Sequence, residues 1–439
     1  MKAREVVLAV IIILAGVFIS QVKSGRMAWD WEVGDFTFVK GEEFVFEEAQ
    51  ELAAPPPADV EILNAHGTVA VEGTENPAVT IRFKKRVYRR NREEAQKIAD
   101  ELRLVVNRTG DRLVLSTNRD AFRRRPFETD FKVSIPAGTP LLVRNSYGLV
   151  QVVGTGKTDI ANPHGEVAAA DIRGELVLEA RHEPVTVDGV RGAAHLSCPY
   201  SRTVIKNVQG ELVIDHAHDE LRLEEIAGRL TVNGRNSRIF ARGLGPEAEI
   251  RTTYEPVTVT GAGSLTIRGH HNDITVIGAS GRCDLANAHG TVRVEDLAGD
   301  LKVEARNTSV VGSRLQGGTL SIVTTYENVD LRGFSGGGTV AFSHAKLVLE
   351  PEAIAGPLEV RGESGDVRLV WPASGTRHPF QAEAWQGTVF WGLAEAPAVA
   401  TTNGTSVTKA FLDERTAPAI SIKTTHVDVR VEASPRRRP

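Results

Sequence analysis

Cysteine is nearly absent from this 439-residue chain, which has only Cys198 and Cys283. Two cysteines are too few for a disulfide framework, and they cannot supply the four-thiolate set of a structural zinc site. Stability must therefore come from a buried core. Because the core has to be built without cross-links, the apolar pattern of the chain is the main source of information on its fold.

Aromatic residues are also scarce, at 6% of the chain, whereas glycine is abundant at 41 residues and apolar residues make up 41%. A core of Val, Leu, Ile and Ala that is interrupted by glycine favours strands and tight turns over helices. The formal net charge of -4 gives no general argument for nucleic-acid binding. Basic clusters are present, and we expect them to be solvated surface, with attraction to an anionic lipid or polysaccharide surface as the alternative. They are Lys84–Arg86, Arg89–Arg92, Arg123–Arg125 and Arg436–Arg438.

Signatures of catalysis are missing as well. The chain has no phosphate-binding loop, no G-x-S-x-G elbow, no calcium nonapeptide and no cysteines at metal-ligand spacing. The densest acidic group lies within Asp215–Glu225, on a short strand, turn and strand, where solvated surface is expected. A glycan-cleaving site would instead need clustered carboxylates in a groove. We therefore predict no enzyme and no catalytic, cofactor-binding or metal-binding residues.

The N-terminal segment has the form of an export signal. Lys2 and Arg4 precede the uncharged apolar run Val6–Ile19, and no clear cleavage site follows. Residues 1–25 are predicted to be an uncleaved signal anchor, with a cleaved signal peptide as the alternative. Either interpretation predicts an extracytoplasmic location, in the periplasm or at the cell surface. Residues 26–58 are expected to be an irregular lead-in or linker.

A glycine column with a period of about 18 residues dominates the rest of the chain. Its intervals are 17 to 20 residues, and a fixed period of this length is the signature of a solenoid. The column is Gly156, Gly174, Gly192, Gly210, Gly228, Gly245, Gly263, Gly281, Gly299, Gly317, Gly336 and Gly356. Residues 156–375 are therefore predicted to be a regular β-solenoid, with the glycines at corners that require positive φ.

Apolar residues occupy fixed offsets from each glycine. Offsets 2 and 4 hold pairs such as Leu212 and Ile214, offsets 11 and 13 hold pairs such as Leu221 and Leu223, and offset 16 is a fifth inward position. Each rung thus has two short strands that pair in parallel with the next rung. Offset 10 is polar, which excludes the left-handed hexapeptide helix. The predicted class is all-β, a right-handed parallel β-helix with rungs of roughly 18 residues.

Both ends of the repeat are expected to be capped. Residues 59–155 form an N-terminal strand region that includes a capping helix at 91–103, and residues 376–433 form C-terminal strands. The tail 434–439 is expected to be disordered. Trp371, Trp385 and Trp391 are concentrated near the C-terminal end, where they are predicted to close the core, with sugar binding as the alternative.

One polar column recurs at the middle corner of each rung and always holds His, Tyr or Asn. The interpretation is a structural ladder, because Asn and His tolerate left-handed backbone geometry and planar groups can stack at the rung spacing. A metal or proton column is the less favoured alternative. The column is His164, His182, Tyr200, His218, Asn236, Tyr254, His271, His289, Asn307, Tyr326 and His344, with His66 and Tyr147 matching it upstream.

Several pieces resemble the bacterial "putative adhesin" family of unknown function, whose members are β-solenoids. The pieces are Asn64–Gly73, Val133–Gly138, Asn145–Gly154 and Ile420–Val431. The resemblance covers about residues 58–433 and implies the fold and an adhesin-like role, without catalytic residues. The predicted function is a non-catalytic envelope protein that binds or scaffolds a protein or polysaccharide ligand, with a membrane contact through its N-terminal segment and no nucleic-acid partner. The alternatives are a glycan-acting enzyme on the same scaffold and a self-assembling structural rod.

Overall fold

The computed structural model describes residues 28–29, 38–39, 41–52, 55–122, 127–372, 377–394, 398–402, 405–411 and 419–434. The chain forms two compact units, Met1–Gly192 and Ala193–Pro439, each of which is a β-solenoid. The predicted export segment at 1–25 lies outside the described residues, as do the basic clusters Arg123–Arg125 and Arg436–Arg438 and all but the first residue of the 434–439 tail. Within the described ranges, no helix has the length and apolar character needed to cross a membrane.

The first unit has a long strand where an irregular lead-in was predicted, at residues 26–58. Strand β3 (Glu42–Leu52) pairs antiparallel with β6 (Val79–Arg89), which also pairs antiparallel with β9 (Phe127–Pro136). Phe44 and Phe46 on β3 pack against the core under the neighbouring helix, while Glu47 forms an ion pair with Lys84. The strand was missed because glutamates surround its two inward phenylalanines.

The helix predicted at 91–103 is α2 (Arg92–Glu101). Its N-cap residue Asn91 accepts a hydrogen bond from the Glu94 backbone N–H, which satisfies one of the free donors of the first turn. Ala95, Ile98 and Ala99 face inward and pack against a cluster that includes Val87 of β6. The helix therefore covers part of the antiparallel strands of this unit.

Parallel strands form most of the remainder of the first unit, with two antiparallel pairs, β1 with β2 and β7 with β8. Thr158 pairs with Leu176, and Val167 pairs with Val185, so partners are 18 residues apart in the chain. The remaining elements are β1 (Ala28–Trp29), β2 (Phe38–Val39), β4 (Asp59–Leu63), β5 (Val69–Thr74), β7 (Leu104–Thr109), β8 (Arg112–Thr117), η1 (Arg119–Ala121), β10 (Leu141–Arg144), β11 (Val150–Val153), β12 (Thr158–Asn162), β13 (Val167–Ile172), β14 (Leu176–Ala180) and β15 (Val185–Val190).

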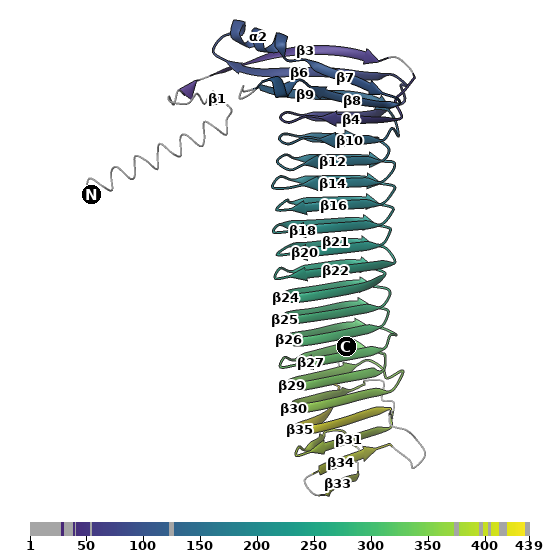
Figure 1. Ribbon diagram of the computed structural model, residues 1–439. Helices are drawn as coiled ribbons and strands as arrows, with labels where there is room; N and C mark the ends of the chain where they lie inside the picture. The colour runs from purple at the N-terminus through teal and green to yellow at the C-terminus, as the bar shows by residue number, and fades with distance from the viewer. Residues whose placement is uncertain are drawn as a thin grey trace, which may run out of the picture. The chain divides into compact units, whose positions relative to one another are not determined.

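The second unit has two alternating series of parallel strands (Figure 1). From β24 onward, several strands run through the corner between the two series and reach 14 to 16 residues. The strands are β16 (Ala194–Pro199), β17 (Thr203–Val208), β18 (Leu212–Ala217), β19 (Glu220–Ile226), β20 (Leu230–Arg235), β21 (Arg238–Leu244), β22 (Glu247–Thr253), β23 (Val257–Ala262), β24 (Ser264–Ala279), β25 (Cys283–Leu297), β26 (Leu301–Leu315), β27 (Leu320–Thr325), β28 (Val329–Phe334), β29 (Gly338–Pro351), β30 (Leu358–Trp371), β31 (Phe380–Trp385), β32 (Val389–Trp391), β33 (Ala398–Thr402), β34 (Thr405–Ala410) and β35 (Ile420–Ala433).

The inward positions predicted from the apolar offsets are buried. Leu212, Ile214, Leu221 and Leu223 have no exposed surface, and neither does Ile226 at the fifth inward position. Cys198 and Cys283 are also buried, and both thiols are free. Stacked rungs thus share one continuous apolar column, which a single rung could not bury by itself.

The reason predicted for the glycine column is wrong. Of its twelve members, Gly317 is the one with a positive φ. Nine of the others are required because the neighbouring rung approaches closely: a Cβ on Gly228 would lie 2.1 Å from the Gly210 carbonyl oxygen, and one on Gly299 would lie 2.2 Å from that of Gly281. Gly356 differs, since the nearest atom to an added Cβ is 3.7 Å away. Left-handed geometry is found instead at the middle corner and at a second corner, which includes Asn207.

The C-terminal strand of the second unit is not the last in space. Strand β35 lies between β30, with which it pairs in parallel, and β31 and β32, with which it also pairs in parallel (Figure 1). The hairpin of β33 and β34 then pairs antiparallel along β31. The order in this part of the unit is therefore β30, β35, β31, β34 and β33.

Candidate functional site

The corner column adopts the predicted left-handed geometry from His182 onward. The φ angles of His182, Tyr200, Asn236 and Tyr254 are 69°, 61°, 52° and 73°. The geometry extends past His344 to Ser364, Gln386 and His426, which the sequence interpretation missed because their spacing departs from the period. Further upstream the corner differs, since Gly67 and Gly148, which directly follow His66 and Tyr147, carry the positive φ.

Rings in this column stack on one another. In the first unit, the ring centroids of His66 and Tyr147 are 4.6 Å apart, those of Tyr147 and His164 are 4.8 Å apart, and those of His164 and His182 are 5.8 Å apart. In the second unit, Tyr200 stacks on His218 at 4.8 Å. These separations match the spacing of neighbouring strands, so the ladder follows directly from the register.

A second stacked stretch in the second unit has three histidines, and its geometry does not suit a metal ion. His271 stacks between Tyr254 and His289, at 5.4 Å and 4.6 Å, while His270 meets His271 edge-on. Parallel rings point their nitrogens in the same direction, whereas zinc requires ligands that converge on one point. Across the described parts of the chain, no group of three or more His, Cys, Asp or Glu side chains could hold a metal.

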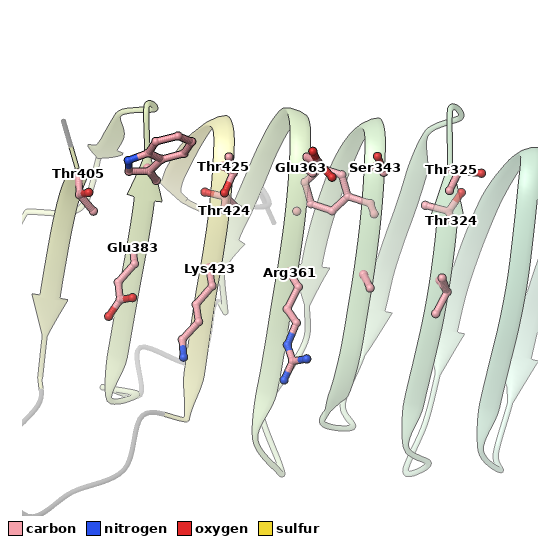
Figure 2. Close-up of a pocket in the computed structure, with 15 residues that line it drawn as sticks. Thr324, Thr325, Ser343, Arg361, Glu363, Glu383, Thr405, Lys423, Thr424 and Thr425 are labelled. Carbon is pink, nitrogen blue, oxygen red and sulfur yellow. The ribbon is translucent and has the colours of Figure 1, made fainter.

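An open groove lies beside this corner column, near the C-terminal end of the second unit. It has a volume of about 520 Å³, and we name it the Trp385 groove (Figure 2). Three rows of residues line it, because the same positions of β27, β29, β30, β35 and β31 stand side by side in register. The first row is Val323, Ala341, Arg361, Lys423 and Glu383; the second is Thr324, Phe342, Gly362 and Thr424; the third is Thr325, Ser343, Glu363, Thr425 and Trp385, with Thr405 beside Trp385.

The floor of the groove combines an aromatic ring with buried hydroxyl groups. A Cβ on Gly362 would lie 2.2 Å from Cζ of Phe342, so the ring occupies the space that a larger residue at position 362 would fill. Thr324 and Thr424 are buried, and their hydroxyl oxygens have no hydrogen-bond partner among the described residues. An unpaired buried hydroxyl is costly, which makes these two groups available to a bound polar molecule.

Charges of both signs line the groove in equal number. Arg361 donates a hydrogen bond from Nε to Glu359 at 2.9 Å, and Gln381 donates one to Glu383 at 2.6 Å. In the strand register, Lys423 of β35 lies directly between Arg361 of β30 and Glu383 of β31. Such a lining offers both hydrogen-bond donors and hydrogen-bond acceptors to a polar, uncharged ligand.

The C-terminal tryptophans have two different environments. Trp371 is 7% exposed and packs with Phe380, Trp391 and Phe411, which closes this end of the core as predicted. Trp385 is instead 46% exposed and lies in the groove, where its ring contacts His426 edge-on at 5.4 Å. An indole that is half exposed and fixed by a neighbour provides a rigid apolar contact surface.

Two carboxylates line the same groove, Glu363 and Glu383. They stand on β30 and β31, with β35 between these strands and an offset of two residues (Figure 2). Strand spacing places their Cα atoms about 12 Å apart. Two carboxylates on the wall of a groove offer hydrogen-bond acceptors to a bound molecule.

The comparisons with known proteins give no family for this chain. No protein-family profile matches it, and no curated protein sequence matches it. A crystal structure of a "putative cell adhesion protein" from Clostridium sporogenes ATCC 15579 is similar over 89% of this chain and 100% of its own, with 8% sequence identity and a TM-score of 0.16. A score of this size carries no argument about fold or function, so the site residues have to be interpreted from their own geometry.

Proposed function

We propose that this chain is a non-catalytic, adhesin-like binding protein of the cell envelope, and that it holds a polysaccharide ligand in the Trp385 groove. The observation that carries the proposal is the environment of Trp385, whose ring is half exposed in a groove while Trp371 is packed into the core. The apolar face of a sugar ring can pack on an indole, and its hydroxyl groups can bond to Arg361, Lys423 and the two glutamates.

The β-solenoid suits such a role because it is built from repeats that present the same outward positions side by side. Fixed rows of side chains can contact successive units of a polymer without any movement of the backbone. The right-handed winding, the rungs of roughly 18 residues and the capping role of α2 belong to the same proposal. The packing of α2 over the antiparallel strands supports the capping role.

Fluorescence titration with neutral polysaccharides tests the proposal. Dextran and mannan are suitable probes, with Trp385→Ala as the test variant and Phe390→Ala as the matched control, since Phe390 is 47% exposed and does not line the groove. We expect that at least one probe binds, and that Trp385→Ala weakens its binding about tenfold or more while Phe390→Ala leaves it unchanged. Absence of binding to every probe, or equal binding by the two variants, would refute the groove as the ligand site.

The rival function is a glycan-cleaving enzyme that uses Glu363 and Glu383. Both hypotheses predict polysaccharide binding, but only the enzyme releases new reducing ends. Prolonged incubation of the protein with dextran, mannan and polygalacturonate should therefore give no increase in reducing ends. Release that disappears in Glu383→Gln would replace the binding hypothesis with the enzymatic one.

The proposed extracytoplasmic location depends on residues 1–25, and the sequence supports it through Lys2, Arg4 and the apolar run that follows. Alkaline phosphatase fused after Pro439 should be active, because this reporter folds only outside the reducing cytoplasm. An inactive phosphatase fusion, together with an active cytoplasmic reporter at the same position, would contradict export. The self-assembling rod is disfavoured by the antiparallel hairpin on β31, which interrupts the parallel edge that a further copy would extend.

A further inference from the structure

A second groove lies among β18, β20, β22 and β24 of the same unit, and it differs from the first in charge. It has a volume of about 610 Å³, and we name it the Arg251 groove. Arg235, Arg251 and Arg268 line it, whereas Asp215 is its one acidic lining residue. His270 stands at its edge and is exposed. Its lining is therefore cationic, in contrast to the balanced charges around Trp385.

Two of these arginines are direct neighbours. Arg251 on β22 pairs in register with Arg268 on β24, so their side chains leave the sheet side by side. Like charges directly opposite each other on neighbouring strands are destabilising unless something compensates them. Glu249 forms an ion pair with Arg251 at 2.6 Å, and Asp284 forms one with Arg268 at 2.8 Å. These partners hold the two guanidinium groups in place without filling the groove between them.

The floor of this groove has an open position and an unpaired polar group. Gly234 stands between His216 and Thr252 in the inward row, and a Cβ there would lie 3.2 Å from the Thr252 hydroxyl oxygen. Thr252 is 4% exposed, and its hydroxyl has no hydrogen-bond partner among the described residues. Both ring nitrogens of His216 are already within hydrogen-bond distance of protein groups, Ser237 and Ser201. The free hydroxyl is thus the group that a ligand could engage.

We infer that the Arg251 groove is a second binding site, which takes the anionic groups of an acidic polysaccharide. Arg251 and Arg268 would hold one carboxylate or sulfate between them through charge-assisted hydrogen bonds, and Arg235 lies within the same groove for a neighbouring sugar unit. An anion in this position would add to the compensation that Glu249 and Asp284 give to the two guanidinium groups. This inference goes beyond the proposed function, because the site has its own ligand chemistry and does not involve Trp385.

A polysaccharide fits this groove better than a nucleic acid does. A polysaccharide carries several hydroxyl groups on every sugar unit, and Ser197 and Thr253 of the lining can bond to them. A single-stranded nucleic acid would instead need aromatic side chains on which its bases stack, and the described lining residues include no Phe, Tyr or Trp.

The test uses the full chain, polygalacturonate oligosaccharides as probe, and surface plasmon resonance at low and physiological salt. The double variant Arg251→Gln/Arg268→Gln removes the paired cations. The matched control, Arg242→Gln/Arg293→Gln, removes two outward arginines of β21 and β25 that do not line the groove. We expect the test variant to weaken binding at least about tenfold, since each lost charge-assisted bond contributes on that order, and the control to bind as the unaltered chain does. Binding should also weaken as salt increases.

Three results would overturn the inference: no binding of polygalacturonate by the unaltered chain, equal losses in the two double variants, or equally tight binding of a single-stranded DNA of similar length. Trp385→Ala keeps this test separate from that of the proposed function. If the two sites are distinct, Trp385→Ala should leave polygalacturonate binding intact. If Trp385→Ala instead lost polygalacturonate binding together with neutral polysaccharide binding, both ligands would be assigned to the Trp385 groove and the second site would be refuted. Thermal unfolding of each variant verifies that the outward substitutions leave the fold intact.

Discussion

Replacing Gly228 by alanine should destabilise the second unit far more than an ordinary glycine substitution. The added Cβ would lie 2.1 Å from the Gly210 carbonyl oxygen and 2.4 Å from its carbonyl carbon. Both of these atoms belong to backbone, so no side chain can rotate away to make room. The two neighbouring rungs would have to separate locally, which disturbs the ladder on both sides of the glycine.

The size of the effect follows from the distances. Ordinary contact begins at 3.4 Å, so relief of the 2.1 Å contact needs a displacement of about 1.3 Å. The adjacent bonds from Ala227 N–H to the Val208 carbonyl and from Leu212 N–H to the Arg229 carbonyl are both 2.8 Å long. A displacement of that size breaks both bonds and leaves two backbone groups of buried residues unpaired, the Val208 carbonyl and the Leu212 N–H, at about 1–3 kcal/mol each. The expected loss in the free energy of unfolding is therefore about 2–6 kcal/mol.

Gly261→Ala provides the control, because its φ is +69° and the nearest atom to an added Cβ, Gly243 N, is 3.8 Å away. That substitution costs only the left-handed strain of an L-residue, about 1–2 kcal/mol. Urea unfolding followed by circular dichroism, together with hydrogen exchange around residues 208–230, measures both variants. Equal stability of the two variants would show that the close backbone approach does not explain the glycine column.

The remaining predictions concern the core, the thiols and the pH dependence. Leu223→Asp puts an unpaired charge into the core and should lower the free energy of unfolding by about 3–5 kcal/mol. Glu224→Ala, on the outward side of the same strand, should change the melting temperature little. Equal melting temperatures of the two variants would show that the strand register is wrong. Burial raises the pKa of the Cys198 and Cys283 thiols to about 12. A thiol reagent should therefore label neither cysteine in the native protein and both after unfolding. One label or none on the unfolded chain would indicate a disulfide bridge or another modification. Burial lowers the pKa of His216 below its ordinary 6.5, so the unfolded chain binds the proton first as the pH falls. The free energy of unfolding should consequently decrease as the pH falls below about 6.5, until the folded-state pKa of His216 is passed. His216→Gln should reduce the difference between the urea midpoints at about pH 7.5 and about pH 5.5. An unchanged difference would show that His216 does not cause the pH dependence.

The repeat itself could be predicted because each inward position has the same environment in every rung. Leu221 and Leu223 are buried for the same reason as Val292 and Val294, so the pattern is reinforced with each repetition. The role of the glycines could not be predicted, since a glycine that allows close backbone contact and one that adopts positive φ are the same letter in a sequence. Only the distance from Gly228 to the neighbouring carbonyl distinguishes them.

The candidate site was not predictable to the same degree. Arg361 and Lys423 are 62 positions apart in the chain but adjacent in space, because β35 enters between β30 and β31. The inward pattern of β35 resembles that of any other strand, so nothing local indicates which neighbours it will have. Outward residues such as Trp385 and Glu363 follow no period either, and their grouping becomes visible only when the register of the strands is known.

The position of β35 also bears on how the chain is completed during synthesis. Strands β30, β31 and β32 are made before β35, yet the backbone of β30 is linked to those of β31 and β32 through β35. A nascent chain that has reached Trp391 therefore has two facing ladders of unpaired backbone groups, and neither is satisfied until residues 420–433 emerge. A chain cut short before Ile420 therefore lacks an interior strand of this unit, and it exposes strand edges to proteases and to aggregation.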